Sequence, residues 1–87
     1  MPPETWRSLE ALGQLLEMHA QPIGAAVPAV AQKIGVQEAQ VRVALRWLAN
    51  PDDGSGPYAE PMPSAQEPVV GVRSLTARGA AKLGELP

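Results

Sequence analysis

Turn-forming residues divide this chain into short segments, and this division constrains its fold more than any other feature. Gln21-Pro22 ends a first helical pattern, because proline disfavours the α conformation in the residue before it. Gly35 follows a second pattern, and the run Asn-Pro-Asp-Asp-Gly-Ser-Gly-Pro at 50–57 follows a third. The 87 residues suit one domain, 1–87, with one small core. We therefore expect short packed elements, with any site on the surface or in a shallow groove.

Three amphipathic helices are predicted before residue 50. The first runs from Trp6 to Met18, where apolar residues recur at steps of three and four. The second spans Val27 to Ile34 and has Pro28 near its start, where the missing N–H of proline is harmless. The third runs from about Gln37 to Ala49. Its inward positions, at spacings of four and three, are Val41, Leu45 and Leu48.

Two strands and a last helix are predicted beyond the turn at 50–57. Residues 58–62 and 69–75 are expected to form a short hairpin around the Pro-rich connection 63–68, since valines favour strands. Pro61 confines the first strand to an edge position. Thr76 is suited to cap a helix that continues to Leu86, with Leu83 and Leu86 facing inward. The expected fold class is mainly α with a small β-hairpin.

The segment 27–46 closely resembles the helix-turn-helix of bacterial transcription regulators. Four positions carry the resemblance: Ala31 is small where two helices cross, Gly35 lies in the turn, and Val36 and Val41 fill the wedge between the helices. Further on, residues 72–83 (VRSLTARGAAKL) are similar to the end of the wing and the start of the last helix in MarR-like and PadR-like regulators.

This resemblance covers roughly Leu9 to Leu86 and implies a winged helix-turn-helix fold. In that fold a three-helix core carries the helix-turn-helix at about 27–49, the wing at about 58–75 and a C-terminal helix at about 76–86. The implied function is binding of double-stranded DNA, with the third helix in the major groove. The solvent-facing positions of that helix would then be Gln37, Glu38, Ala39, Arg42, Val43 and Arg46.

Charge is distributed unevenly, although the chain has a net charge of −2. Three cations against one carboxylate give +2 over residues 28–50 and again over 73–87, whereas four carboxylates give −4 over 51–72. For the DNA-binding reading, Gln37 and Arg42 are candidate readers of base edges, and Arg46 would meet a phosphate or a guanine. Lys33, Arg73 and Arg78 are the candidate phosphate contacts. The alternative is a solvated face with ordinary charges.

The apolar residues of that face leave two functions open. Ala39 and Val43 suit contact with thymine methyl groups or with another protein equally well. We predict a sequence-specific, homodimeric transcription regulator, joined through its first and last helices, where Trp6 and Leu9 supply apolar surface. Packing within the chain is the alternative for Trp6. The second function is a winged-helix protein-protein interaction module in a larger assembly, which would use Val43, Ala39 and the neighbourhood of Trp47. The Trp47 side chain is expected to be half exposed and to pack under the hairpin with Tyr58 and Leu75.

Other functions lack the residues that they require. The chain has no Cys, and His19 alone cannot hold zinc. No apolar run approaches the roughly 20 residues that span a bilayer, and no signal peptide is recognisable, so we expect a cytoplasmic protein without membrane contact. Asp52-Asp53 is interpreted as a turn. We expect no catalytic residue, cofactor or metal ion, because the chain has no Cys, no second His, no Gly-rich phosphate-binding loop and no carboxylate pair that spacing places on one face.

Overall fold

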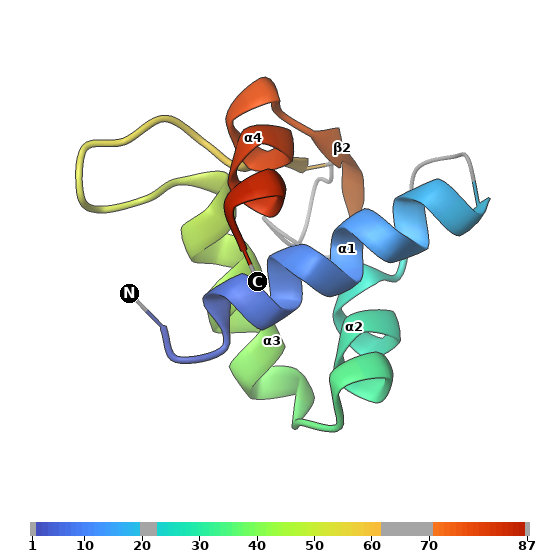
Figure 1. Ribbon diagram of the computed structural model, residues 1–87. Coiled ribbons are helices and arrows are strands. Elements are labelled where there is room, and N and C mark those ends of the chain that lie inside the picture. Colours follow the sequence, from blue (N-terminus) through green and yellow to red (C-terminus); the bar gives the residue numbers. More distant parts are fainter. Residues whose placement is uncertain (1, 20–22, 62–70, 87) are drawn as a thin grey trace.

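The computed structural model describes residues 2–19, 23–61 and 71–86, which form helices and a two-stranded antiparallel sheet (Figure 1). The elements in chain order are α1 (Thr5–His19), α2 (Ala26–Ile34), α3 (Glu38–Ala49), β1 (Ala59–Pro61), β2 (Val72–Leu75) and α4 (Ala77–Glu85). This confirms the predicted order and the mainly α class. The finer assignment to a winged helix stays a prediction. The expected connection 63–68, together with residues 62, 69 and 70 of the expected strands, lies outside the described ranges.

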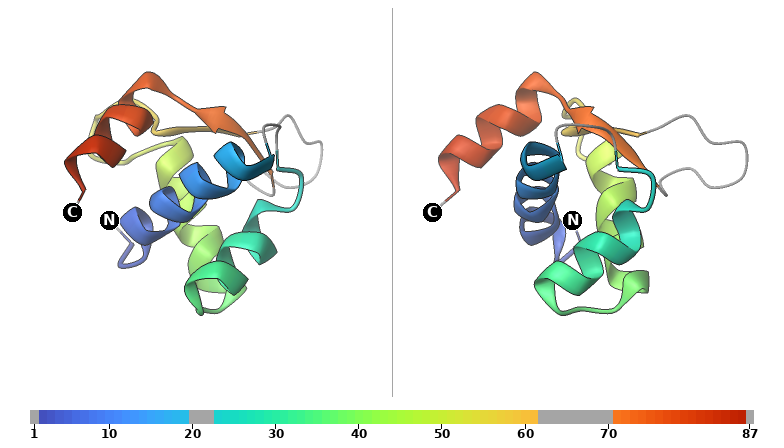
Figure 2. Two further views of the ribbon diagram at one scale, coloured as in Figure 1. Left: turned by 45° about the vertical axis from the view of Figure 1, so that its right-hand side comes forward. Right: turned by 90° about the vertical axis from the view of Figure 1, so that its right-hand side faces the viewer.

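Helices α1, α2 and α3 enclose the core, and α4 packs on the other side of α1, as the two views of Figure 2 show. The aliphatic stripes that the sequence indicates face one another there. Leucine and valine side chains with no exposed surface fill this space: Leu9, Leu12, Val30, Val41, Leu45, Leu48 and Val72. Leu83 of α4 approaches α1 at Gly13, where a Cβ atom would lie only 2.6 Å from Leu83 Cδ1. The inward orientation predicted for Leu83 is confirmed.

Two predicted helix ends are confirmed by their hydrogen bonds. Gly35 follows α2 in the left-handed conformation, with φ of 73°, and its N–H donates to the carbonyl of Ala31 at 2.9 Å. Thr76 precedes α4, and its hydroxyl oxygen accepts from the N–H of Gly79 at 3.0 Å. Both residues therefore fix where the chain changes direction.

The small sheet also includes a contact that the sequence did not predict. Strands β1 and β2 pair Ala59 with Leu75, and their register is irregular between Glu60 and Pro61. Ile23, which precedes α2, exchanges two 2.9 Å hydrogen bonds with Val72 of β2. The start of α2 is thereby attached to the sheet.

The aromatic residues gather in one cluster, which corrects two expectations. Trp47 is 8% exposed, not half exposed, and its Nε1–H donates to Asp52 at 2.8 Å. Its ring stacks on that of Tyr58 at a centroid distance of 5.8 Å, which confirms the expected packing of these two residues. Trp6 meets both rings edge-on, at centroid distances of 5.9 and 5.3 Å. Trp6 thus packs within the chain, and Leu9 is fully buried. These two residues do not form the free apolar surface expected for a homodimer.

Helix α4 is held against this cluster by charge as well as packing. The Lys82 ammonium lies 4.6 Å from the centre of the Trp6 ring, and the Arg78 guanidinium lies 5.6 Å from that of Tyr58. The backbone of Tyr58 is also close, since its carbonyl accepts from the N–H of Thr76 at 3.1 Å. Gly79 is the residue that permits this approach, because a Cβ there would lie 2.0 Å from the Tyr58 carbonyl oxygen.

Two glycines of α4 give a matched test of this packing. We predict that Gly79→Ala lowers the free energy of unfolding by about 1–3 kcal/mol, since α4 must move away from Tyr58. Gly84→Ala adds a methyl group with no atom within 4 Å, so it should leave stability unchanged or raise it by up to about 1 kcal/mol through helix propensity. Chemical denaturation measures both. Equal midpoints for the two variants would contradict the placement of α4.

Candidate nucleic-acid interface

The outer face of α3 consists of Gln37, Glu38, Ala39, Arg42, Val43 and Arg46, and all six residues are exposed. They lie opposite the buried positions of the helix, which include Val41, Leu45 and Leu48. Val43 is 53% exposed, although large apolar side chains elsewhere in α3 point inward. The structure therefore brings together the six residues that the sequence assigns to one face.

Arg42 and Arg46 stand one helical turn apart on this face. Within residues 2–19, 23–61 and 71–86, the ion pairs closer than 4.0 Å are Arg7 with Glu4 and Arg73 with Glu60. Neither arginine of α3 takes part in one. Their guanidinium groups can therefore bind an external anion or hydrogen-bond acceptor without first breaking an ion pair in the described part of the chain.

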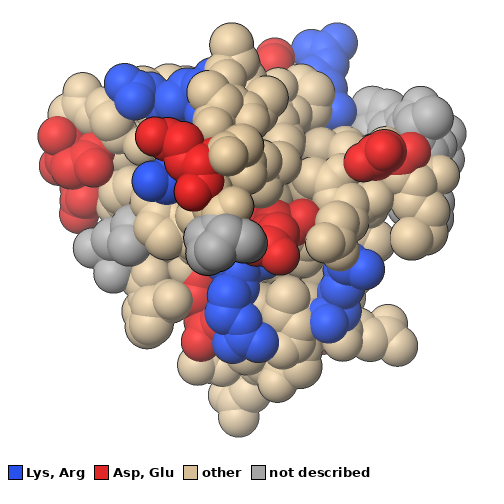
Figure 3. Space-filling view, viewed as in Figure 1, with Lys and Arg blue, Asp and Glu red and all other residues tan. Residues whose placement is uncertain are grey.

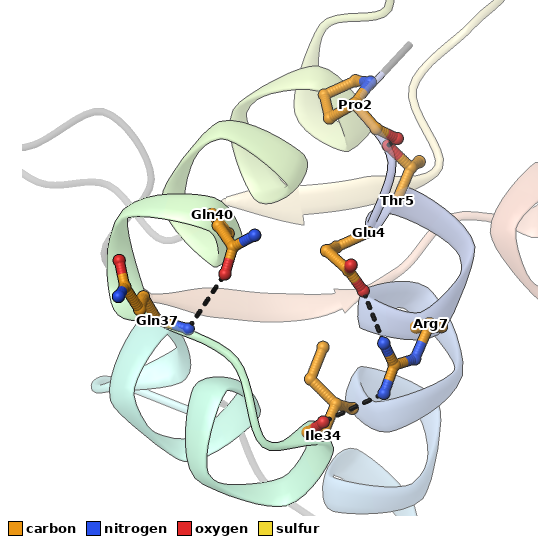
Figure 4. A network of polar contacts seen from close by, with 7 residues as sticks. All are labelled: Pro2, Glu4, Thr5, Arg7, Ile34, Gln37 and Gln40. Atoms are coloured by element: carbon orange, nitrogen blue, oxygen red, sulfur yellow. Dashed lines mark hydrogen bonds and ion pairs between the residues drawn. The ribbon is translucent and has the colours of Figure 1, made fainter.

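A network at the start of α1 fixes the turn that leads into α3 (Figure 4). Arg7 donates from Nη2 to the carbonyl oxygen of Ile34 and from Nη1 to Glu4, both at 2.9 Å. The Ile34 carbonyl lies at the C-terminus of α2, where unpaired carbonyls carry partial negative charge that attracts a cation. Sequence reasoning missed this bond. Only the three-residue spacing of Glu4 and Arg7 hinted at an ion pair, and nothing in the pattern pointed to Ile34.

The first turn of α3 is closed by a side chain of its own. The N–H of Gln37 donates to Oε1 of Gln40 at 3.1 Å (Figure 4), which satisfies a backbone donor that the helix leaves free. Gly35 makes the turn before it, and Val36 packs against the core. The start of α3 is therefore held both by the Gln37–Gln40 hydrogen bond and by the turn at Gly35 and Val36.

An apolar groove runs beside the outer face and was not predicted. Pro2 and Pro3 form one wall and Ala39 and Val43 the other, around a volume of about 270 Å³. A second hollow of about 360 Å³ shares Pro2 and Val43 and extends to Arg46. The sequence does not predict this groove, because the residues before α1 have no periodicity that would place them beside α3.

The other three predicted contact residues lie in separate surroundings. Lys33 lines a hollow together with Arg7, Glu10 and Gln14 of α1. Arg73 lies 3.8 Å from Glu60 across the two strands, and Arg78 lies over Tyr58. Seen from the side of α1, the cations are scattered among carboxylates and do not form one patch (Figure 3). The phosphate contacts assigned to Lys33, Arg73 and Arg78 remain predictions.

The acidic turn after α3 uses its carboxylates internally. Asp52 accepts from Trp47, and Asp53 accepts from the hydroxyl and the N–H of Ser55, which lowers the pKa of Asp53 below its usual value. Within the described ranges, no three His, Asp or Glu side chains are grouped so that they could hold a metal ion. Among the helices of those ranges, none has the length and apolar character needed to cross a membrane.

The bond from Arg7 to Ile34 can be tested by paired substitutions. We predict that Arg7→Met lowers the free energy of unfolding by about 1 kcal/mol, because the Ile34 carbonyl loses its donor. Arg73→Met removes a more distant, exposed ion pair and should change stability by less than about 0.5 kcal/mol. Urea denaturation compares the two proteins. A loss for Arg7→Met no larger than for Arg73→Met would show that the network does not hold the turn.

The chain matches no protein-family model, and no curated protein or solved structure is significantly similar to it. Function is therefore inferred from the outer face of α3, the groove beside it and the chemistry of their residues.

Proposed function

We propose that this protein binds double-stranded DNA sequence-specifically, as a small transcription regulator of winged helix-turn-helix type. The observation that carries the proposal is the outer face of α3, an exposed helix surface with two arginines that have no ion-pair partner among the described residues. An α-helix fits the major groove of B-DNA. The short turn at Gly35 and the Arg7 network support the proposal, since they hold α3 rigidly enough to position its side chains.

The four polar side chains of the face each have a suitable hydrogen-bond partner in the major groove. Arg42 and Arg46 can donate two hydrogen bonds each to O6 and N7 of guanine. Gln37 can pair with adenine, and Glu38 can accept from N4 of cytosine. Lys33, Arg73 and Arg78 are proposed to meet phosphates. As a regulator, the protein would act in the cytoplasm.

A homodimer belongs to the proposal because twofold symmetric proteins read palindromic sites. Its contact would use exposed side chains of α1 and α4, since Leu9 is buried and Trp6 packs on Trp47 and Tyr58. Light scattering at high micromolar concentration measures the association state. A monomer would remove the homodimer and leave the outer face of α3 to read a single half-site.

The second candidate is a protein-protein interaction module, which the groove between Pro2, Pro3 and Val43 favours. Its almost entirely carbon walls suit an apolar segment of another protein. The two functions differ in their response to salt. DNA affinity falls with ionic strength because phosphate contacts release counterions, whereas an apolar contact is nearly insensitive to salt.

Selection from a random duplex pool at low salt tests DNA binding directly. We expect enrichment of one sequence family, whose affinity falls with salt at a logarithmic slope of about −2 to −4 for a few phosphate contacts. An unenriched pool would contradict sequence-specific binding and leave the interaction module as the better account.

On the enriched duplex, Arg42→Ala and Lys33→Ala should fail differently. Arg42→Ala is expected to cost about 1–3 kcal/mol and to relax preference at one base pair, since a base contact is lost. Lys33→Ala should weaken all sequences alike and reduce the salt slope by about one, as expected for one phosphate contact. Fluorescence anisotropy over a salt series measures both effects.

Unchanged affinity and unchanged sequence preference in Arg42→Ala would mean that α3 does not read bases. An unchanged slope in Lys33→Ala would instead remove only Lys33 from the interface, consistent with its place beside Arg7 and Glu10 of α1.

A further inference from the structure

The outer face of α3 contains an apolar ridge formed by Ala39 and Val43, which are one helical turn apart. Two large apolar side chains are strongly exposed in the described ranges, Val43 at 53% and Met18 at 67%. Valine is a poorer helix former than alanine or leucine, and its exposure at this position leaves about half of its surface without burial energy. Neither local helix stability nor the core therefore accounts for valine at this position.

Carbon continues from this ridge into the groove beside it. Ala39 and Val43 face Pro2 and Pro3 across the hollow of about 270 Å³. A small apolar group entering at Val43 would meet carbon on more than one side. The ridge is thus part of a wider apolar surface, not a single exposed side chain of the kind that most proteins carry.

A second row of different chemistry runs beside the ridge. Arg42 directly precedes Val43, and Arg46 follows it three residues later. Neither arginine forms an ion pair within the part of the chain that the structure describes. The face therefore has hydrogen-bond donors next to an apolar surface that can contact a methyl group. A purely apolar partner would leave two guanidinium groups at its edge without acceptors.

The major groove offers the matching pattern, because guanine presents two acceptors there and thymine presents its C5 methyl group. We infer that the ridge of Ala39 and Val43 reads thymine methyl groups, next to guanines that are bound by Arg42 and Arg46. This inference rests on the proposed DNA binding and deepens it. The preferred site contains thymine beside guanine, and Val43 is the specificity-determining residue for the methyl group.

Deoxyuridine tests the inference, since it lacks only the methyl group of thymine and keeps its hydrogen bonds. Each thymine of the enriched duplex is replaced singly, and affinity is measured by anisotropy. At one or two positions we expect about a fourfold loss, the factor that corresponds to burial of one methylene-sized group. At the other thymines the affinity should not change.

Val43→Ser links the loss to its residue, because serine removes both methyl groups of valine and leaves a hydroxyl in their place. This variant should bind thymine and deoxyuridine duplexes equally at the sensitive position. Met18→Ser is the matched control, a change to the same residue at an exposed apolar position of α1. It should retain the fourfold preference for thymine.

The outcomes separate this inference from the function on which it rests. Failure to enrich any duplex overturns both. Enrichment with equal affinity for thymine and deoxyuridine at every position, or a site without thymine, overturns the methyl reading and leaves DNA binding intact. A thymine preference that persists in Val43→Ser also overturns the assignment. Salt-insensitive binding of an apolar peptide at Val43, without duplex binding, would identify a protein partner instead.

Discussion

Trp6, Trp47 and Tyr58 pack against one another and join three segments that are far apart in the sequence. These three residues are all the aromatic side chains of the chain, which has no phenylalanine. They bring together the start of α1, the end of α3 and the entry to β1. Because the core is otherwise built from leucine, valine and alanine, the rings supply the largest single surfaces available for packing.

Tyr58 extends this contact through its backbone. Its N–H donates to the carbonyl of Leu48 at 2.8 Å, and its own carbonyl accepts from the N–H of Thr76 at 3.1 Å. The backbone of Tyr58 is therefore hydrogen-bonded to both the end of α3 and the residue that precedes α4. The other end of α3 is held by Gly35 and the Arg7 network. The inner side of α3 is buried in the core. Its outer face is left to solvent, and the functional proposal concerns that face.

The sequence predicted the helices well because their signals are local. Steps of three and four identified the buried stripes, Gly35 indicated a left-handed turn, and Thr76 indicated a cap. The six residues of the outer face of α3 followed from the same periodicity, since a helix that buries one side must expose the other.

What the sequence could not predict depends on contacts between distant segments. Periodicity shows which side of a helix is apolar, but it does not show what covers that side, so Trp6 was assigned to a homodimer and Trp47 was expected to be half exposed. Likewise, no local pattern joins Ile23 to Val72, or Arg7 to a carbonyl 27 residues away. The cations outside α3 could be assigned only by resemblance, and the structure gives each of them a different neighbour.

NMR titration of the ¹⁵N-labelled protein with its enriched duplex can show whether the outer face of α3 contacts DNA. We expect the largest amide shift changes at Ala39, Arg42, Val43 and Arg46, with small changes along the outward side of α4. Shift changes concentrated on α1 and α4, with α3 unaffected, would contradict this contact.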